Sequence, residues 1–225
     1  MQSLSLQDHT LDAIPHLDST LASARALVDN LASWHEGKSH GNIKTFRKRT
    51  TEPGPDWHAR ASTHPPDQAS FDEFWTCLGI DHSLHEKEYI PEIHSAVHLG
   101  TFGAFQAWSL GYRFPPPVSD RTFTFLIASV LEESPTRQGY IITLPLDVSS
   151  DEELKSREPK GVRGRYVSVE RVRQLDGEVE WSMATMSNAG GMIPVFLSES
   201  QMPSKISQDV PHVLDWIKKK RELQS

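Results

Sequence analysis

A glutamate and several arginines lie on predicted strands whose other residues are largely apolar. Arg165 and Glu170 belong to the stretch from Arg163 to Arg173, and Arg121 begins an earlier one. A carboxyl group removed from water can act as a general acid or base, because desolvation raises its pKa, and a guanidinium can polarise a substrate oxygen. Glu170 with Arg121 or Arg165 is therefore our candidate catalytic set. Such a pair could equally bind a ligand or only stiffen the sheet, and shifting a strand by one residue would reverse which side chains face inward.

Other familiar kinds of catalytic or metal site have no matching pattern. His82 and His85 are three residues apart beside a glutamate, and His94 and His98 are four apart in a predicted strand, but no third ligand follows at a telling spacing. No G-x-S-x-G motif marks an acyl-transfer nucleophile. The single cysteine, Cys77, lies among aromatic residues and is predicted to be an inert core thiol. We expect neither a metal nor a cofactor.

The stretch from Trp181 to Pro194 is the sharpest structural pattern in the chain. It begins with the alternation of a strand and stops at Asn188-Ala189-Gly190-Gly191, where two glycines allow backbone angles closed to other residues. Pro194 suits the first turn of a helix, which does not need the missing N–H. The pattern predicts a strand that turns abruptly into a helix packed close to the sheet.

The elements around this stretch follow from periodicity and turn residues. Helical spacing predicts helices over 18–34, from Asp67 to Gly79, over 82–90 and after Val195, where Pro203 is expected to kink the chain and an apolar stripe continues to Ile217. We favour packing of the first helix on the outside of the domain over a dimerising or membrane-facing role. Alternation and turn residues predict strands over 42–50, 57–64, 92–99, 104–112, 121–131, 139–146, 163–173 and 178–186.

We make three further predictions, for a turn, for a loop and for the basic end of the last helix. Asp176-Gly177 is typical of a tight hairpin turn. Residues 147–160 are acidic and nearly free of apolar side chains, which predicts a mobile surface loop and a candidate flap over a cavity mouth. The basic run Lys218, Lys219, Lys220 and Arg221 suits the end of a helix, and it is also a candidate patch for transient contact with an anionic membrane surface.

Several motifs in chain order resemble one known family. These are Trp57 with Ser62 and His64, then His85-x-x-Glu88-Tyr89, Arg121-x-Phe123, Gly161-x-x-x-x-Tyr166-x-Ser168-Val169-Glu170, Trp181-x-Met183-Ala184-Thr185, Ala189-Gly190-Gly191-x-Ile193-Pro194, and Asp209-Val210 ahead of Trp216. Together they resemble a largely fungal family of unknown function in the START-like, or SRPBCC, superfamily. Asn188 stands where the family pattern would place Asp.

The resemblance implies an α+β helix-grip fold, with a curved antiparallel sheet wrapped around a long C-terminal helix and an apolar cavity between them. We expect an N-terminal helical extension over residues 1–41 and one START-like domain over 42–225. Residues expected to line the cavity are Arg121, Arg165, Glu170, Trp181, Met183, Thr185, Asn188 and Phe196.

The amino-acid composition limits which binding partners and which cellular compartment we expect. The 225 residues carry 30 acidic and 23 basic side chains, a net charge of −7, which argues against a general nucleic-acid binder. One cysteine excludes an internal disulfide and fits a reducing compartment. The N-terminus lacks the pattern of a secretory signal, so we expect a soluble cytoplasmic protein.

The sequence leads us to consider two functions of different classes, a binding module and an enzyme. The first is a module that binds or transfers one apolar small molecule, such as a lipid, a sterol or a polyketide, in the cavity. The second is an enzyme of the cyclase or isomerase type that acts on a secondary metabolite in the same cavity, with Glu170 as general acid or base. A third possibility is an interaction scaffold with a filled interior.

Overall fold

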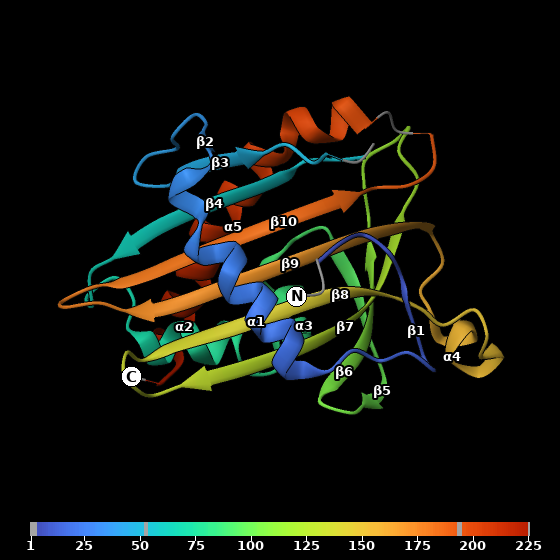
Figure 1. The fold of residues 1–225 in the computed structure, drawn as a ribbon, viewed down its shortest axis with the longest axis horizontal. Helices are drawn as coiled ribbons and strands as arrows, with labels where there is room; N and C mark the ends of the chain where they lie inside the picture. Colours follow the sequence, from blue (N-terminus) through green and yellow to red (C-terminus); the bar gives the residue numbers. More distant parts are fainter. Residues whose placement is uncertain (1–3, 52–53, 193–194, 225) are drawn as a thin grey trace.

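The structure is a computed structural model that describes residues 4–51, 54–192 and 195–224, with the side chains of residues 195–198 and 224 excepted. Figure 1 shows a broad sheet with one helix crossing it in front and a long helix running behind it. We refer to the two sides of the sheet as the α1 face and the α5 face, after the helices α1 (Leu17–Asp29) and α5 (Val195–Gln224) that cover them.

The sheet contains ten strands within the described residues. The strands are β1 (His9–Thr10), β2 (His35–Glu36), β3 (Lys44–Lys48), β4 (Trp57–His64), β5 (Ile93–Phe102), β6 (Phe105–Tyr112), β7 (Arg121–Glu132), β8 (Gln138–Asp147), β9 (Val162–Gln174) and β10 (Val179–Asn188). Their order is β2-β3-β4-β10-β9-β8-β7-β6-β5, and β1 pairs with β8 off this path. Neighbours on the path are antiparallel, whereas β1–β8 and a short β7–β9 contact are parallel.

The helices are α1 (Leu17–Asp29), α2 (Phe71–Leu78), α3 (His82–Tyr89), α4 (Glu152–Arg157) and α5 (Val195–Gln224), with a 3-10 turn at Leu31–Ser33. Ser70 begins α2 with a reciprocal pair of bonds to Glu73, the capping box typical of a helix N-terminus. Pro203 and Pro211 both lie inside α5, and its first turns run in a different direction from the remainder. The predicted strands and helices are confirmed, apart from residues 147–160.

The side chains of the hairpin of β9 and β10 point alternately to the two faces of the sheet. Gly177 adopts a φ of +78° at the predicted turn, and the register places Glu170 opposite Met183. Because side chains alternate along a strand, Ser168 and Glu170 point to the α5 face, whereas Val167 and Val169 point to the α1 face.

The α1 face is covered by an apolar core. Leu21, Ala24 and Val28 of α1 pack with buried residues of the sheet such as Leu126 and Ile142. The predicted helix therefore packs against the sheet, which confirms the favoured interpretation. On the α5 face a second core joins α2, the sheet and α5, and its members include Phe74, Leu78, Trp181, Val213 and Ile217.

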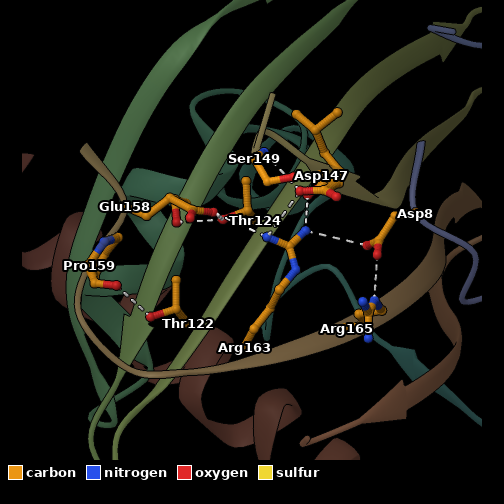
Figure 2. Close-up of polar contacts among 11 residues, drawn as sticks. Asp8, Thr122, Thr124, Asp147, Ser149, Glu158, Pro159, Arg163 and Arg165 are labelled. Atoms are coloured by element: carbon orange, nitrogen blue, oxygen red, sulfur yellow. Dashed lines mark hydrogen bonds and ion pairs between the residues drawn. The ribbon is translucent and has the colours of Figure 1, made fainter. Parts of the chain in front are cut away.

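Residues 147–160 contain the short helix α4 where the sequence predicted only a surface loop, and none of the residues of α4 is buried. Asp151 accepts from the Leu154 N–H at 3.0 Å and begins the helix. Figure 2 shows how the segment is anchored: Arg163 of β9 lies 3.4 Å from Glu158 and 3.9 Å from Asp147. Arg163 also reaches Asp8 of the N-terminal segment at 3.4 Å. Two of the acidic residues that suggested a solvated loop, Asp147 and Glu158, are therefore partners of an arginine on β9.

Candidate functional site

A cavity of about 300 Å³ lies between the α5 face of the sheet and helices α3 and α5. Its sheet wall comes mainly from β4, β7, β9 and β10, and its helix wall carries Met202, Ile206 and Asp209 of α5. More of the lining surface is apolar than polar, and several charged groups interrupt it: Arg60, Glu86, Glu92, Arg121, Glu170, Lys205 and Asp209. Small-molecule pockets combine apolar walls, which supply binding energy, with polar groups that fix the orientation of the ligand.

Arg60 of β4 is the most unusual group in this lining. Its side chain is fully buried, and its guanidinium carbon lies 3.7 Å from the centre of the Trp181 ring. The only acceptor within reach of it among the described residues is the thioether of Met183, 3.8 Å from Nη2. Burial lowers the pKa of Arg60, and the nearby carboxylates of Asp209 and Glu170 oppose that shift.

Glu170 is held in place by the neighbouring strand and by α3. Its Oε2 accepts from the indole Nε1 of Trp181 at 2.9 Å, and its Oε1 lies 3.9 Å from Nε2 of His82. The other ring nitrogen of His82 lies 2.8 Å from the carbonyl oxygen of Leu78. Because a carbonyl oxygen only accepts, Nδ1 carries a proton and Nε2 faces the cavity.

Glu86 completes a cluster at this end of the cavity. It lies 3.8 Å from His82 and accepts from the hydroxyl of Tyr112 at 3.2 Å. Desolvation raises the pKa of Glu86, and it also raises the pKa values of Tyr89, Tyr112 and Tyr166 well above their usual range. The three tyrosine hydroxyls are therefore uncharged and can donate hydrogen bonds. The cluster offers both hydrogen-bond donors and acceptors to a ligand in the cavity.

Asp209 faces the sheet from α5. Desolvation raises its pKa to about 7, with Glu170 and Glu86 adding to the shift and Arg60 opposing it. A carboxyl group that titrates near neutrality in a cavity is suited to donating or accepting a proton. Asp209 therefore combines two possible roles, as a hydrogen-bond partner for a ligand and as an acid or base.

The segment joining β10 to α5 supports the prediction made from its glycines. Gly190 and Gly191 have φ values of +67° and +65°, and a Cβ on Gly190 would lie 2.1 Å from the carbonyl oxygen of Arg163. Only glycine fits this close approach without strain. Arg121 donates from Nε to the Ala189 carbonyl oxygen at 2.7 Å, and Nη1 donates to Ser119. Arg121 therefore lines the cavity while its donors hold the turn.

The structure brings together five of the residues expected to line a cavity. They are Arg121, Glu170, Trp181, Met183 and Thr185. The hydroxyl of Thr185 already donates to the Val167 carbonyl oxygen at 3.1 Å.

Three expected residues are not placed in the cavity. The Nε of Arg165 lies 2.6 Å from Asp8 (Figure 2). Arg165 is an odd number of residues from Glu170 on β9, so it points to the α1 face and not into the cavity. The Asn188 side chain accepts from the Gly190 N–H at 2.9 Å and shapes the turn. The side chain of Phe196 lies outside the described residues.

Sequence reasoning missed Arg60, His82, Glu86 and Asp209. Arg60 had a usable signal, because His58, Arg60, Ser62 and His64 alternate with small residues and so share one face of β4. Asp209 also had one, since it follows Ile206 by three residues and therefore shares the apolar stripe of α5. No periodicity marked Glu86, whose role depends on how α3 meets the sheet.

A serine and histidine pair on β4 does not offer an accessible nucleophile. His64 lies 2.8 Å from the Ser62 hydroxyl and 2.7 Å from the side-chain oxygen of Gln68. Ser62 and His64 are 3% and 0% exposed, and neither lines the cavity. Within the described residues, no group of three or more His, Cys, Asp or Glu side chains could hold a metal ion.

The basic residues at the end of α5 are partly engaged in ion pairs. Lys220 lies 2.9 Å from Glu88 of α3, and Arg221 donates to Glu73 of α2 at 2.7 Å. These pairs attach the end of α5 to the two short helices. Contact of Lys218, Lys219, Lys220 and Arg221 with a membrane stays a prediction. Among the helices described, none is long and apolar enough to span a bilayer.

The fold is similar to those of several solved lipid-transfer proteins. A crystal structure of human STARD10 has a TM-score of 0.72 at 8% identity, covering 94% of this chain and 83% of that one. Human StAR-related lipid transfer protein 5 has a TM-score of 0.69 at 11% identity, covering 92% and 100%. A STAR-related lipid transfer protein from Xanthomonas axonopodis has a TM-score of 0.62 at 14% identity, covering 82% and 98%.

These likenesses confirm the START-like helix-grip fold. A search of curated proteins found no match to the sequence. A family model described as "Protein of unknown function (DUF3074)" matches residues 57–217. The matched segment contains the cavity-facing strands, the glycine turn and most of α5, and by this match the chain belongs to the DUF3074 family.

Proposed function

We propose that this protein binds one apolar small molecule in the cavity between the sheet and α5, and carries it through the cytoplasm. The observation that supports this most directly is the cavity itself, a space of about 300 Å³ inside a fold whose α1 side is filled by side chains. Two of the structural neighbours are named as lipid transfer proteins, which favours carriage over a purely structural role.

The size of the cavity favours a compact ligand. Small-molecule pockets span roughly 300–1,000 Å³, so this one lies at the lower end of that range. A single ring system or one short chain suits such a space better than a lipid with two long chains. Burying about 250 Å² of apolar ligand surface contributes roughly 6 kcal/mol before the costs of association. Micromolar affinity is attainable only with added polar contacts.

Enzymatic chemistry in the same cavity is the second candidate. The observation that favours it is the pairing of Asp209, with a pKa of about 7, and the guanidinium of Arg60 across the cavity. Glu170, with Arg121 on the same wall, remains the candidate predicted from the sequence. In this reading a carboxyl group moves a proton while a guanidinium stabilises a developing negative charge on oxygen.

Native mass spectrometry of the gently purified protein, followed by organic extraction, tests the proposal. We expect a stoichiometric small molecule that is lost on denaturation. The variant Ser168→Leu should reduce occupancy, because Ser168 lines the cavity and the larger side chain fills it. The control Ser129→Leu changes an exposed residue of β7 and should keep the ligand.

Equal occupancy in the two variants would contradict a ligand in this cavity. To separate carriage from catalysis, the extracted molecule is incubated with wild type, Glu170→Gln and Asp209→Asn. Conversion by wild type that either variant abolishes would favour the enzyme, and recovery of the unchanged molecule from all three would favour the carrier.

A further inference from the structure

Arg60 offers hydrogen-bond donors inside the cavity that no protein oxygen takes. Its Nε and Nη1 have no partner among the described residues, and Nη2 meets only the weak thioether acceptor of Met183. The guanidinium carbon lies 3.7 Å from the centre of the Trp181 ring, so the group cannot leave this wall without losing its cation–π contact. A buried guanidinium in this position favours any ligand that places an oxygen in its plane.

Across the cavity, Asp209 is the carboxylate that interacts most strongly with Arg60. No carboxylate oxygen of the described residues lies within 4 Å of the guanidinium, so the two groups do not form a direct ion pair. Both side chains line the cavity. A group between them can therefore accept from Arg60 and donate to Asp209.

We propose that Arg60 and Asp209 together bind a hydroxyl group of the ligand, so that the cavity selects a compact, uncharged alcohol or phenol. This inference rests on the proposed function and names the ligand class for the same site. The hydroxyl oxygen accepts from the guanidinium, and the hydroxyl proton is donated to the carboxylate. The apolar remainder of the ligand lies against Trp181, Phe123 and Ile206.

The charges around the cavity disfavour an anionic ligand such as a carboxylate. Glu86, Glu170 and Asp209 all line the space that such a ligand would enter. Two further cations line the cavity, but Arg121 donates to backbone carbonyl oxygens instead of toward the centre, and the ammonium group of Lys205 lies over the ring of Phe114. A pure hydrocarbon is disfavoured for a different reason, since it would leave the donors of Arg60 unpaired.

The test compares three probes with the same ring system: naphthalene, 2-naphthol and 2-naphthoic acid. Dissociation constants are measured by protein-observed NMR titration near neutral pH, where naphthoic acid is ionised and naphthol is not. Because a hydrogen bond to a charged group contributes about 1.5–3 kcal/mol, wild type should bind 2-naphthol at least about tenfold more tightly than naphthalene. It should bind 2-naphthoate more weakly than 2-naphthol.

The variant Arg60→Met isolates the guanidinium. Methionine keeps much of the apolar stem, and the preference for 2-naphthol over naphthalene should fall to about twofold or less. Arg165→Met is the matched control, because Arg165 lies on the opposite face of the sheet, and its preference should equal that of wild type. If Arg60→Met does not fold, Asp209→Ala serves instead and should reduce the same preference severalfold.

Two results would overturn this inference alone: equal binding of naphthalene and 2-naphthol by wild type, or tightest binding of 2-naphthoate. Either would leave the proposed function standing, since a probe would still occupy the cavity. Binding of none of the three probes would overturn the proposed function and this inference together.

Discussion

The two faces of the sheet differ in how completely side chains fill the space next to them. On the α1 face, most alternate residues of the central strands are valine, isoleucine, leucine or alanine, and α1 packs directly on them, while the buried Arg171 pairs with Asp29 of α1. On the α5 face, the same strands present Arg60, Ser168, Glu170 and Thr185, and a cavity remains below α5. The period of two along each strand therefore separates a stabilising core from a binding surface.

This difference shows how one sheet can serve stability and function without conflict. Filled cores lose free energy when side chains are shortened, because a new void forms. Residues beside an existing cavity lose fewer packing contacts on truncation, so ligand binding constrains their residue types more than packing does. Polar groups such as Arg60 are tolerated there because the core on the α1 face and the second core around α2 and α5 stabilise the fold.

The largest effect is expected for Ile142→Ala on the α1 face. Ile142 is fully buried in the filled core, so its truncation should lower the free energy of unfolding by about 2–5 kcal/mol. Urea denaturation measures this loss. The affinity of the folded fraction for its ligand should not change. A weakened affinity would contradict the view that the α1 face supports stability and the α5 face supports binding.

Next comes Gly190→Ala, in the turn that places α5 over the cavity. The added Cβ would meet the Arg163 carbonyl oxygen at 2.1 Å, and alanine is strained at a φ of +67°. We expect a loss of roughly 1–3 kcal/mol in the free energy of unfolding. Gly177→Ala is the comparison, since its φ is also positive but nothing lies within 4 Å of the added Cβ. Equal losses would mean that backbone strain alone accounts for the effect.

A smaller, pH-dependent effect is expected at Asp209. Its folded pKa of about 7 exceeds the ordinary value of 3.8, so between these values the native state binds more protons than the unfolded state. This group's contribution to stability is therefore greatest at low pH and is lost as the pH rises toward about 7.

The variant Asp209→Asn cannot titrate, so it should remove that slope. We expect it to be more stable than wild type by roughly 1–2 kcal/mol near pH 8, after allowing for the relaxation of a cavity-lining group. Denaturation curves at about pH 5 and pH 8 measure the difference. An unchanged pH dependence would show that Asp209 titrates normally in the native state.

The smallest effect on stability is expected for Met183→Ala. Met183 borders the cavity and is half-buried, so its truncation should cost less than about 1.5 kcal/mol while changing ligand affinity. Ile142→Ala should lower stability and leave ligand affinity unchanged, whereas Met183→Ala should change ligand affinity with little loss of stability. A larger stability loss for Met183→Ala than for Ile142→Ala would contradict the comparison.

The sequence predicted the framework well because the relevant signals are local. The alternation in Trp181–Thr185, the turn at Asp176-Gly177 and the stripe from Ile206 to Ile217 each depend on residues close in the chain. For residues 147–160 the acidic side chains correctly indicated a surface position, since no residue of α4 is buried. The pairing of Glu158 and Asp147 with Arg163 joins residues of different elements, so neighbours in sequence did not reveal it.

The site was predictable only in part, because a cavity is formed by residues far apart in the chain. Trp181, Met183 and Glu170 were found because they share one hairpin, whereas Arg165 was assigned to the same side although the register turns it to the other. Arg60 and Asp209 lie 149 positions apart in the numbering and meet only after the sheet and α5 have packed.

The central claim is that a small apolar molecule occupies the space below α5. The most direct test is an amide NMR titration of the wild-type protein with naphthalene, 2-naphthol and 2-naphthoic acid in turn, read residue by residue. We predict saturable shift changes on the cavity-lining parts of β4, β9, β10 and α5, with α1 unaffected. Changes centred on α1, or no saturable change at all, would contradict a ligand-binding cavity in this protein.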